Sequence, residues 1–590
     1  MCSIHGIYRK NSHYSQTQQF EFIMNMLQQS QFRGPDFTGL KQISDRLIFA
    51  SNRLSIQDTS SNAIMPFYHK KNGNWIVFNG EIYNISDIRN QLLSLGYTFT
   101  SQSDTEVVLY SFDCWGVDCL NLFNGIFAFA IWDNSKKNIF LARDRYGIKP
   151  LYYTNNNNIF CFGSELKNIV TISNNFIDTA SFTAYMIFRF VPSYKTIYKD
   201  IYKLNVGEYL IFDTNNNTIN KHKYWKPLIS QNSLTDKENE TLFFEKLHQS
   251  ILESTIGDVP YGVLLSGGID SSAIVASLAN SGIKEIQTFS CAYEKSNIID
   301  EPDEIEFANI IAKKFNTNHN IVTLCKADIE NFFDKMVYSL DEPLASQDAL
   351  SHYIFAQKMD SNVKYLLSGT GADKLLGGYF ELFFGLSGKK LKHIKNSIDF
   401  LQLVSCDSSP INNILSLINP DYLDTSYYTH ELTKVLSDDK FNFVDEIMSA
   451  YVKFLFAFDL PDWELLQTDR VYMSNSFEVR PVFLNNNLVD FALTLPAKFK
   501  YNGKTGKPIL YNSFNKILPK KILNRKKYPS LTTPKMWYKT DWFKNKILET
   551  SSNLSDFWNK RKVYDILSSE NFDLAYRIIH FETWHKLNCR

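Results

Sequence analysis

The chain has 590 residues, of which 44% are hydrophobic and 21% are charged, as in folded globular proteins and unlike disordered chains. A chain of this length exceeds one compact core, so at least two domains are expected. Its 62 Lys and Arg residues equal its 62 Asp and Glu residues. This balance removes the general electrostatic argument for a nucleic-acid partner or an anionic membrane surface.

Cysteine spacing and hydropathy give no indication of a zinc-binding, disulfide-rich or membrane-spanning protein. The eight cysteines include no CxxC pair, so neither a zinc site nor a disulfide framework is indicated. No apolar run of the sequence approaches the roughly 18 residues of a membrane span, and the N-terminal stretch is polar where a signal peptide would be apolar. We therefore expect no nucleic-acid or membrane partner and a cytoplasmic protein.

The second residue, Cys2, is a candidate nucleophile because of its position. Removal of Met1 places a thiol and a free α-amine on one residue, and an amine with a pKa of roughly 8 can accept the thiol proton near neutral pH. A cysteine near a terminus is by itself a weak indication, since termini are usually poorly ordered. Its assignment depends on the motifs that follow.

The N-terminal part is predicted to consist of short strands with few helices. Several of the strands are apolar on both faces, which indicates sheets that are covered on both sides. Helices are predicted at 18–31 and 86–95. The predicted strands are 46–50, 75–78, 126–132, 138–142, 159–162 and 209–212.

Composition changes after residue 212. Residues 213–240 are polar and rich in Asn, which predicts a linker between a domain at 1–212 and a second domain at 241–590. In the second domain strands and helices alternate, and this pattern predicts an α/β fold with a doubly wound parallel sheet. Beyond about residue 394 the chain is predicted to be mostly helical, with a charged, aromatic-rich tail at 553–590.

A glycine-containing loop follows the apolar strand 261–265 and precedes a predicted helix. Its adjacent glycines allow backbone N–H groups to point at an anion, and the helix N-terminus adds its positive end. Its hydroxyls can donate to phosphate oxygens, and Asp270 is a candidate magnesium ligand. The loop consists of Ser266, Gly267, Gly268, Ile269, Asp270, Ser271 and Ser272.

A second acidic loop, residues 368–379, follows the predicted strand 363–367. Loops that leave neighbouring parallel strands at their carboxyl ends point into the same crevice. Asp373 is therefore a candidate for a second carboxylate on the same metal ion.

The first loop resembles the SGGxDS signature of ATP pyrophosphatases, which cleave ATP between its α and β phosphates. With Cys2 and further motifs, the chain resembles glutamine-dependent asparagine synthetases over nearly its whole length. The resemblance implies an N-terminal-nucleophile hydrolase fold, an αββα sandwich, followed by an ATP-pyrophosphatase domain with a helical C-terminal part. The matching N-terminal motifs are RGPD at 33–36, RLSI at 53–56, NGEIYN at 79–84, SDTE at 103–106 and ARDRYGIKP at 142–150.

The resemblance implies a class II glutaminase site in the first domain. Cys2 would attack the side-chain amide of glutamine, with Asn79 and Gly80 forming the oxyanion hole. Arg53 can bind the glutamine carboxylate, while Asp104, with help from Glu81, can hold its ammonium. The implied glutamine-binding residues are Arg53, Leu54, Ser55, Ile56, Gln57, Asn79, Gly80, Glu81 and Asp104.

In the second domain the resemblance implies a site for ATP with Mg²⁺. Asp270 and Asp373 would hold the metal ion, and Lys527 would stabilise charge as ammonia attacks an acyl-adenylate. The implied ATP-binding residues are Leu265, Ser266, Gly267, Gly268, Asp270, Ser271, Ser272, Cys291, Ser368 and Gly369.

Four residues depart from the family pattern. Ser3 follows the nucleophile, where glycine is usual. Thr370 stands where asparagine synthetases carry an acidic residue that is linked to forming the aspartyl-adenylate. Lys374 replaces a Glu and Asn485 an Asp. Charge is thus removed or inverted near the predicted acid site, so the acceptor carboxylate stays open.

The resemblance implies that glutamine is hydrolysed to glutamate and ammonia, and that ammonia amidates a carboxylate activated by ATP. With aspartate as acceptor the products are asparagine, AMP and pyrophosphate. One alternative keeps this mechanism with another acid, such as a uronic acid sugar of surface polysaccharide. A second is a regulatory homologue without synthetase activity. The oligomeric state also stays open, with a homodimer as one expectation.

Overall fold

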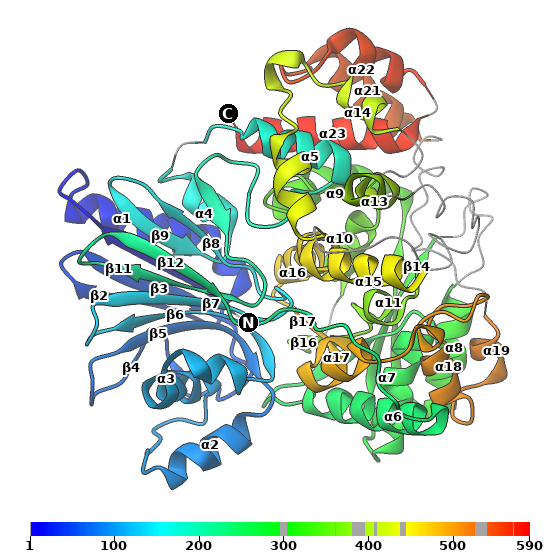
Figure 1. Cartoon of the computed structure of the whole chain (residues 1–590), viewed down its shortest axis with the longest axis horizontal. Coiled ribbons are helices and arrows are strands. Elements are labelled where there is room, and N and C mark those ends of the chain that lie inside the picture. The colour runs from blue at the N-terminus through cyan, green and yellow to red at the C-terminus, as the bar shows by residue number, and fades with distance from the viewer. Residues whose placement is uncertain are drawn as a thin grey trace.

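The computed structural model describes residues 2–173, 175–294, 304–359, 362–379, 394, 396–405, 410–436, 444–525, 540–569 and 571–589. Two β-sheets and their covering helices form one half of the molecule, and a parallel sheet surrounded by helices forms the other (Figure 1). The N-terminus lies at the edge of the first half that faces the second (Figure 1).

The first half contains two six-stranded sheets whose strand pairs are antiparallel. One sheet has the order β10-β8-β9-β1-β3-β2 and the other β12-β11-β7-β6-β5-β4. All six predicted strands fall within them. The strands are β1 (Cys2–Arg9), β2 (Phe37–Ser44), β3 (Leu47–Arg53), β4 (Phe67–Tyr68), β5 (Trp75–Ile82), β6 (Gly125–Asp133), β7 (Asn138–Arg143), β8 (Tyr152–Asn155), β9 (Ile159–Gly163), β10 (Ile201–Lys203), β11 (Glu208–Asp213) and β12 (Thr218–Lys223).

Helices cover the outer faces of both sheets, which gives the predicted αββα layers (Figure 1). Helices α1 (Gln16–Gln29) and α4 (Leu166–Val170) cover one sheet, and α2 (Ile85–Ser94) and α3 (Asp104–Trp115) cover the other. Because each sheet is enclosed on both sides, every residue of β6 is buried. The predicted fold class of this half is confirmed.

The segment 213–240, predicted as a linker, contains regular structure at both ends. Thr218–Lys223 is strand β12, and helix α6 begins at Asp236. Strand β12 lies at the sheet edge with most of its side chains exposed, so its composition is that of a loop. Residues 224–235 connect the two halves without helix or strand.

The second half is built on a five-stranded parallel sheet of order β15-β14-β13-β16-β17. Its strands are β13 (Tyr261–Leu264), β14 (Gln287–Tyr293), β15 (Asn318–Leu324), β16 (Tyr365–Ser368) and β17 (Glu478–Pro481). Because β13 and β16 are neighbours, the two predicted loops leave the sheet side by side, as expected.

Helices form most of the remaining chain; some cover this sheet, and others lie at the top of the view, apart from it (Figure 1). They include α5 (Thr179–Phe188), α6 (Asp236–Glu253), α7 (Ile269–Asn280), α8 (Glu304–Phe315), α9 (Lys326–Ser339), α10 (Ala349–Lys358), α11 (Ala372–Leu376), α13 (Ser397–Ser405), α14 (Ile411–Leu415), α15 (Val444–Phe454), the π-helix η7 (Leu455–Leu465), α16 (Leu466–Met473), α17 (Asn486–Leu493), α18 (Pro508–Phe514), α19 (Lys520–Leu523) and α21 (Asp541–Ser552). Among the described residues, no helix combines the length and apolarity needed to cross a membrane.

The prediction of a charged tail at 553–590 is wrong. Two helices, α22 (Lys560–Leu567) and α23 (Phe572–Asn588), occupy most of it. Helix α23 buries charged and aromatic side chains together, including Arg577, His580 and Trp584. Charged residues usually indicate a solvated segment, but in α23 several of them are buried and have hydrogen-bond partners. The Arg577 guanidinium, for example, donates to the carbonyl of Met186 at 2.7 Å.

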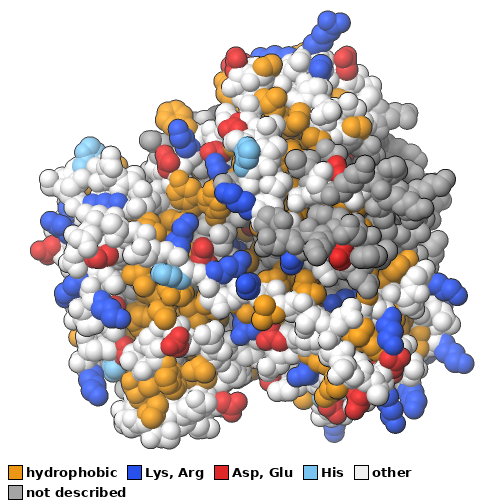
Figure 2. Space-filling model, in the orientation of Figure 1, with side chains coloured by type: hydrophobic (Ala, Val, Ile, Leu, Met, Phe, Trp, Pro, Cys, Tyr) orange, Lys and Arg blue, Asp and Glu red, His pale blue; other side chains and the backbone are white. Residues whose placement is uncertain are grey.

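The surface carries charges of both signs. On the face shown in Figure 2, Lys and Arg side chains are mixed with Asp and Glu side chains over both halves of the molecule. This distribution agrees with the equal numbers of basic and acidic residues in the sequence.

Candidate active sites

Cys2 begins β1 and lies opposite Arg53 of β3. Only 7% of the residue is exposed. Its backbone nitrogen, which becomes the α-amine once Met1 is removed, donates to Asn79 Oδ1 at 3.0 Å. Burial raises the pKa of the thiol, and the positive charge of Arg53 and the Leu54 N–H act in the opposite direction. The structure thus places thiol and future amine beside three of the predicted residues.

Only one of the two polar groups of the Asn79 amide has a hydrogen-bond partner among the described residues. Its oxygen accepts from Cys2, but its Nδ2 is buried and has no hydrogen-bond partner within the described part of the chain. A buried donor without a partner costs free energy, so its presence points to an absent acceptor. At Gly80 a Cβ atom would lie 2.1 Å from the carbonyl oxygen of Ile126, so the close approach of β5 and β6 requires glycine there.

The Arg53 guanidinium is positioned by backbone carbonyls. It donates to Gln57 O at 3.0 Å and to Asp58 O at 2.5 Å. In the described part of the chain Arg53 has no carboxylate partner, which leaves its charge available to a bound anion. The loop that supplies the carbonyls is tied to the second half, since the Asp58 N–H donates to Asp258 at 2.8 Å.

The remaining predicted contacts of the glutamine lie in the same segment, 54–57. The Ser55 N–H donates to Asp36 at 2.7 Å, and the Ile56 carbonyl accepts from the N–H of Asp258 at 2.8 Å. Leu54 and Ile56 are buried, while Gln57 has a buried side-chain oxygen without a partner in the described residues. The RLSI motif therefore forms the wall where the two halves meet.

Asp104 and Glu81 place two buried carboxyl groups near each other, and Asp104 lies near Arg53. Asp104 lies in the first turn of α3, where Ser103 caps the helix, and its Oδ2 has no partner among the described residues. Burial raises the pKa of Asp104 to about 6, opposed by backbone N–H groups and by Arg53. Glu81 differs from the prediction in part, because its Oε2 accepts from Arg480 of the second half at 2.8 Å.

Ser3 and His5 belong to a local hydrogen-bond network. The Ser3 hydroxyl is fully buried and donates to Asn52 Oδ1 at 2.7 Å. His5 Nε2 lies 2.9 Å from the Ser30 hydroxyl and 3.1 Å from that of Ser3, and burial lowers the His5 pKa to about 3. The added volume of Ser3 is thus accommodated beside the nucleophile, and His5 is a neutral packing residue.

A cavity of about 330 Å³ lies at the carboxyl ends of β13 and β16. The predicted residues that line it are Leu265, Ser266, Asp270, Ser271, Cys291, Ser368, Gly369, Thr370 and Asp373. Three predicted residues stand behind this wall. At Gly267, with a φ of +70°, a Cβ atom would lie 2.4 Å from the N–H nitrogen of Ala308, so the loop approaches α8 closely. Gly268 caps α7, and the Ser272 hydroxyl is buried without a partner in the described residues.

Lys507 connects the two predicted metal ligands, and the sequence analysis missed it. Its ammonium lies 2.7 Å from Asp270 Oδ2 and 2.7 Å from Asp373 Oδ1, and only 3% of the residue is exposed. The two carboxylates raise the pKa of Lys507. No spacing in the sequence relates Lys507 to either aspartate, since the three residues meet only in the folded chain.

Glu464, also missed, reaches the cavity from η7. Its Oε1 accepts from the Gly371 N–H at 3.0 Å, while its Oε2 is buried without a partner in the described part of the chain. Burial raises the pKa of Glu464, and the nearby Lys374 opposes this shift. Lys374 itself forms an ion pair with Asp459 of the same π-helix. A carboxylate is therefore present one residue from Thr370.

Two other residues named by the sequence lie elsewhere. Asn485 caps α17 and donates to Glu253 at 2.7 Å, outside the cavity lining. Lys527 lies outside the described residues. The chain leading to it passes the phosphate loop, because Arg525 donates to Ser266 O at 3.1 Å and pairs with Glu304 at 2.9 Å.

Buried ion pairs join the two halves. Arg33 of the RGPD motif is fully buried and contacts Glu165 at 2.6 Å and Asp469 of the second half at 2.7 Å. Arg470 also pairs with Glu165, and with Asp341 at 3.1 Å. Removing one partner of such a group would leave a buried charge uncompensated, so the interface holds the halves in one arrangement.

A thiol site on an αββα sandwich and a cavity at the switch point of a parallel sheet define a two-domain amidotransferase of the ligase type. Residues 1–225 match the glutamine amidotransferase domain family, and residues 243–586 match the asparagine synthase family. The chain belongs to the asparagine synthase family, and the resemblance inferred from its motifs is confirmed.

The chain is also similar to individual proteins. The chain is 29% identical to the glutamine-hydrolysing asparagine synthetase 1 of Bacillus subtilis, with 100% of this chain and 97% of the relative covered. Asparagine synthetase 3 of the same organism is 28% identical, with 91% and 89% covered. Among solved structures, the allosteric regulatory enzyme of purine biosynthesis matches with 14% identity and a TM-score of 0.30, over 51% of this chain and 68% of that one.

Proposed function

We propose that the protein is a glutamine-dependent asparagine synthetase, which makes asparagine, AMP and pyrophosphate from aspartate and ATP with ammonia taken from glutamine. The observation that carries the proposal is the Asn79 amide, whose oxygen holds the Cys2 nitrogen while its N–H group has no partner among the described residues. This arrangement suits a thiol attack on an amide carbonyl.

In the first half, Cys2 would attack the side-chain carbonyl of glutamine after its α-amine takes the thiol proton. The negative oxygen that forms would accept from Asn79 Nδ2 and from the Gly80 N–H. Arg53, which has no carboxylate partner in the described part of the chain, offers its guanidinium charge to the substrate carboxylate, and Asp104 offers the substrate ammonium a carboxylate oxygen that has no partner among the described residues. Ammonia leaves, and water then releases glutamate from the thioester.

Ammonia has to reach the second half without entering bulk water, where near pH 7 it is protonated and no longer nucleophilic. A cavity of about 10 Å³ lies between the halves, lined by Ile148 and Lys149 on one side and by Thr370 and Asp469 on the other. A cavity of roughly 10–15 Å³ holds one water-sized molecule, and ammonia is of that size. This position supports transfer between the two sites.

In the second half, a carboxylate oxygen of the acceptor would attack the α-phosphorus of ATP and displace pyrophosphate. Ser266 and Ser271 offer hydroxyls to the phosphates, and Lys507 offers a buried positive charge. Asp270 and Asp373 provide the hard oxygen donors that Mg²⁺ prefers and would hold the ion, which neutralises phosphate charge. Lys527 is proposed to stabilise the acyl-adenylate as ammonia displaces AMP.

The acceptor is proposed to be aspartate because of Glu464. Glu464 lines the cavity that also holds the phosphate loop, and its Oε2 is buried without a hydrogen-bond partner among the described residues. A buried carboxylate of this kind binds a cationic group of the substrate, and aspartate carries an ammonium whereas a uronic acid does not. The presence of both carboxylates and of the phosphate loop argues against a homologue without synthetase activity.

Two assays test the proposal. Cys2→Ala should abolish glutamine hydrolysis and glutamine-dependent synthesis but retain synthesis from ammonium salts, with Cys114→Ala as a matched control that keeps both. ATP–pyrophosphate exchange should be stimulated by aspartate and not by glucuronate. Exchange with glucuronate alone would establish the sugar-acid alternative, and no exchange with any acid the regulatory one. Hydrolysis retained by Cys2→Ala would refute the nucleophile.

A further inference from the structure

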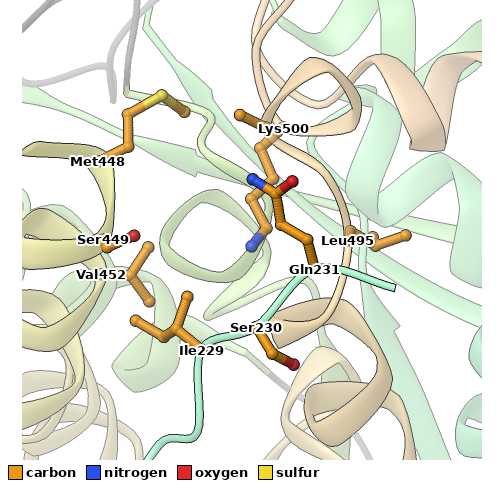
Figure 3. Close-up of a pocket in the computed structure, with 9 residues that line it drawn as sticks. Ile229, Ser230, Gln231, Met448, Ser449, Val452, Leu495 and Lys500 are labelled. Carbon is orange, nitrogen blue, oxygen red and sulfur yellow. The ribbon is translucent and has the colours of Figure 1, made fainter. Parts of the chain in front are cut away.

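A third cavity, of about 150 Å³, lies apart from both sites (Figure 3). Among the described residues, it shares no lining residue with the cavity at β13 and β16. Its walls come from the connection between the halves, from α15 and from the segment after α17. The lining residues are Ile229, Ser230, Gln231, Met448, Ser449, Val452, Leu495, Ala497 and Lys500.

Lys500 is the charged residue of this cavity. Its side chain reaches inward, with the amine directed toward the space bounded by Val452, Ile229 and Gln231 (Figure 3). Only 5% of the residue is exposed, and its amine has no hydrogen-bond or ion-pair partner in the described part of the chain. Lys507, by contrast, is buried between two carboxylates.

A buried ammonium without a counter-ion costs free energy. Burial lowers the pKa of Lys500 to about 8. A group with this pKa is still mostly protonated at neutral pH, so the cavity carries a net positive charge that an anion would neutralise.

The size and walls of the cavity indicate the kind of anion. A cavity of about 150 Å³ accommodates a molecule of benzene size, on the order of six heavy atoms. Ile229, Val452 and Leu495 supply apolar surface, and Ser449 and Gln231 add a hydroxyl and an amide to the wall (Figure 3). An inorganic phosphate would leave the apolar walls without contacts, whereas a short aliphatic chain would cover them.

We propose that this cavity binds a small aliphatic monocarboxylate, with its carboxylate on the Lys500 ammonium and its carbon chain against Ile229, Val452 and Leu495. The site is separate from the predicted glutamine and ATP sites, so such a ligand binds together with both substrates. It is linked to the ATP cavity through Lys507, whose N–H donates to the Lys500 carbonyl at 2.8 Å and whose ammonium contacts Asp270 and Asp373 of that cavity.

Calorimetric titration of the full-length protein with butyrate and with 1-butanol tests the charge of the site. The two probes have similar size and shape, but only butyrate can pair with an ammonium. Butyrate is expected to bind about tenfold more tightly or better, since hydrogen bonds to charged groups are the strong ones. Saturating glutamine and a non-hydrolysable ATP analogue should leave its affinity unchanged. Equal affinity for the two probes, or displacement of butyrate by either substrate, would overturn the proposal.

Two further measurements locate the site. Lys500→Met should make the affinities for butyrate and 1-butanol equal, while Lys498→Met, which changes an exposed lysine two residues earlier, should leave the difference intact. In crystals of the unaltered protein, the anomalous signal of 4-bromobutyrate should lie in this cavity. The crystal experiment decides the question even if Lys500→Met does not fold. Bromine found elsewhere, or an unchanged preference in Lys500→Met, would refute the assignment.

Discussion

Replacing Asn79 by Asp separates the two contacts of one side chain. In the unaltered protein the Cys2 nitrogen lies 3.0 Å from Asn79 Oδ1, and the carboxylate of the variant keeps an oxygen for this contact. The variant lacks the Nδ2 group, which has no partner among the described residues of the unaltered protein. It also brings negative charge toward the oxyanion. Loss of one oxyanion donor lowers kcat by about 10²–10³, or roughly 3–4 kcal/mol. We therefore expect glutaminase kcat to fall by at least that factor, with the KM for glutamine little changed.

The KM expectation follows from the contacts of the substrate's other groups. Arg53 and Asp104 are proposed to hold the carboxylate and the ammonium of glutamine. Neither forms a hydrogen bond with the Asn79 amide in the described part of the chain. Asn79→Ala, which also removes the acceptor for the Cys2 nitrogen, should lower kcat further than the loss of the donor alone. The difference between the two variants measures what the held amine contributes.

The assay is steady-state glutamate release, with ammonia-dependent synthesis measured on the same preparations. Asn84→Ala is the matched control, since Asn84 ends the same motif and donates to the carbonyl of Leu122 at 2.9 Å, away from Cys2. A kcat for Asn79→Asp within about threefold of the unaltered enzyme would refute the oxyanion assignment. A parallel fall in ammonia-dependent synthesis would instead show that the fold had been damaged.

Four other changes probe the rest of the molecule. Because the pKa of Asp104 is raised to about 6 and only its carboxylate binds an ammonium, kcat/KM for glutamine should fall about tenfold per pH unit below pH 6; Asp104→Asn should be low throughout and lack this inflection. Lys507→Met leaves two carboxylates facing the triphosphate, so the KM for ATP in pyrophosphate exchange should rise roughly tenfold or more. Glu464→Gln should raise the KM for the acceptor acid about tenfold and leave that for ATP unchanged. Arg33→Met removes the close counter-ion of the buried Asp469 and one of the partners of Glu165, and should lower the free energy of unfolding by about 3–5 kcal/mol, whereas the exposed Lys136→Met should change it by less than about 1 kcal/mol.

Each of these has a contrary outcome. If the acid inflection persists in Asp104→Asn, it arises from the titration of another group, such as Glu81. An unchanged KM for ATP in Lys507→Met would mean that the lysine only neutralises its two carboxylates. Equal rises of both KM values in Glu464→Gln would indicate a disturbed cavity rather than acceptor recognition. Urea unfolding with equal midpoints for Arg33→Met and the unaltered protein would show that the buried pairs contribute no net stability.

The grouping of the candidate glutaminase residues could be predicted from the sequence because these residues lie in short local motifs. The NGEIYN stretch is a strand that carries Asn79 and Gly80, and SDTE is a helix start that carries Asp104. A short motif of this kind determines the local backbone geometry, so a match to the family's motif predicts where its side chains lie. The parallel sheet was predictable for a similar reason, since alternating strands and helices determine which loops meet at the carboxyl ends.

What could not be predicted depends on long-range packing. Helix α3 was missed because its residues 104–112 are all buried, which removes the amphipathic period that identifies a surface helix. Lys507 and Glu464 were missed because each reaches its partners across a long separation, with Lys507 237 residues from Asp270 and Glu464 93 residues from Gly371. No spacing in the sequence reports such contacts.

The fold offsets the loss of negative charge at Thr370 and Lys374. Thr370 and Lys374 together remove negative charge from a loop whose sequence resembles one that binds an acid. In the structure, the positive charge of Lys374 is compensated by Asp459. A carboxylate from Glu464 lies on the Gly371 N–H, next to Thr370, with one oxygen still unpartnered among the described residues. We therefore propose that Glu464 of the π-helix η7 supplies the acidic group that position 370 lacks. Since the local field, and not the identity of one residue, determines which acceptor binds, the departures in the loop do not by themselves exclude aspartate.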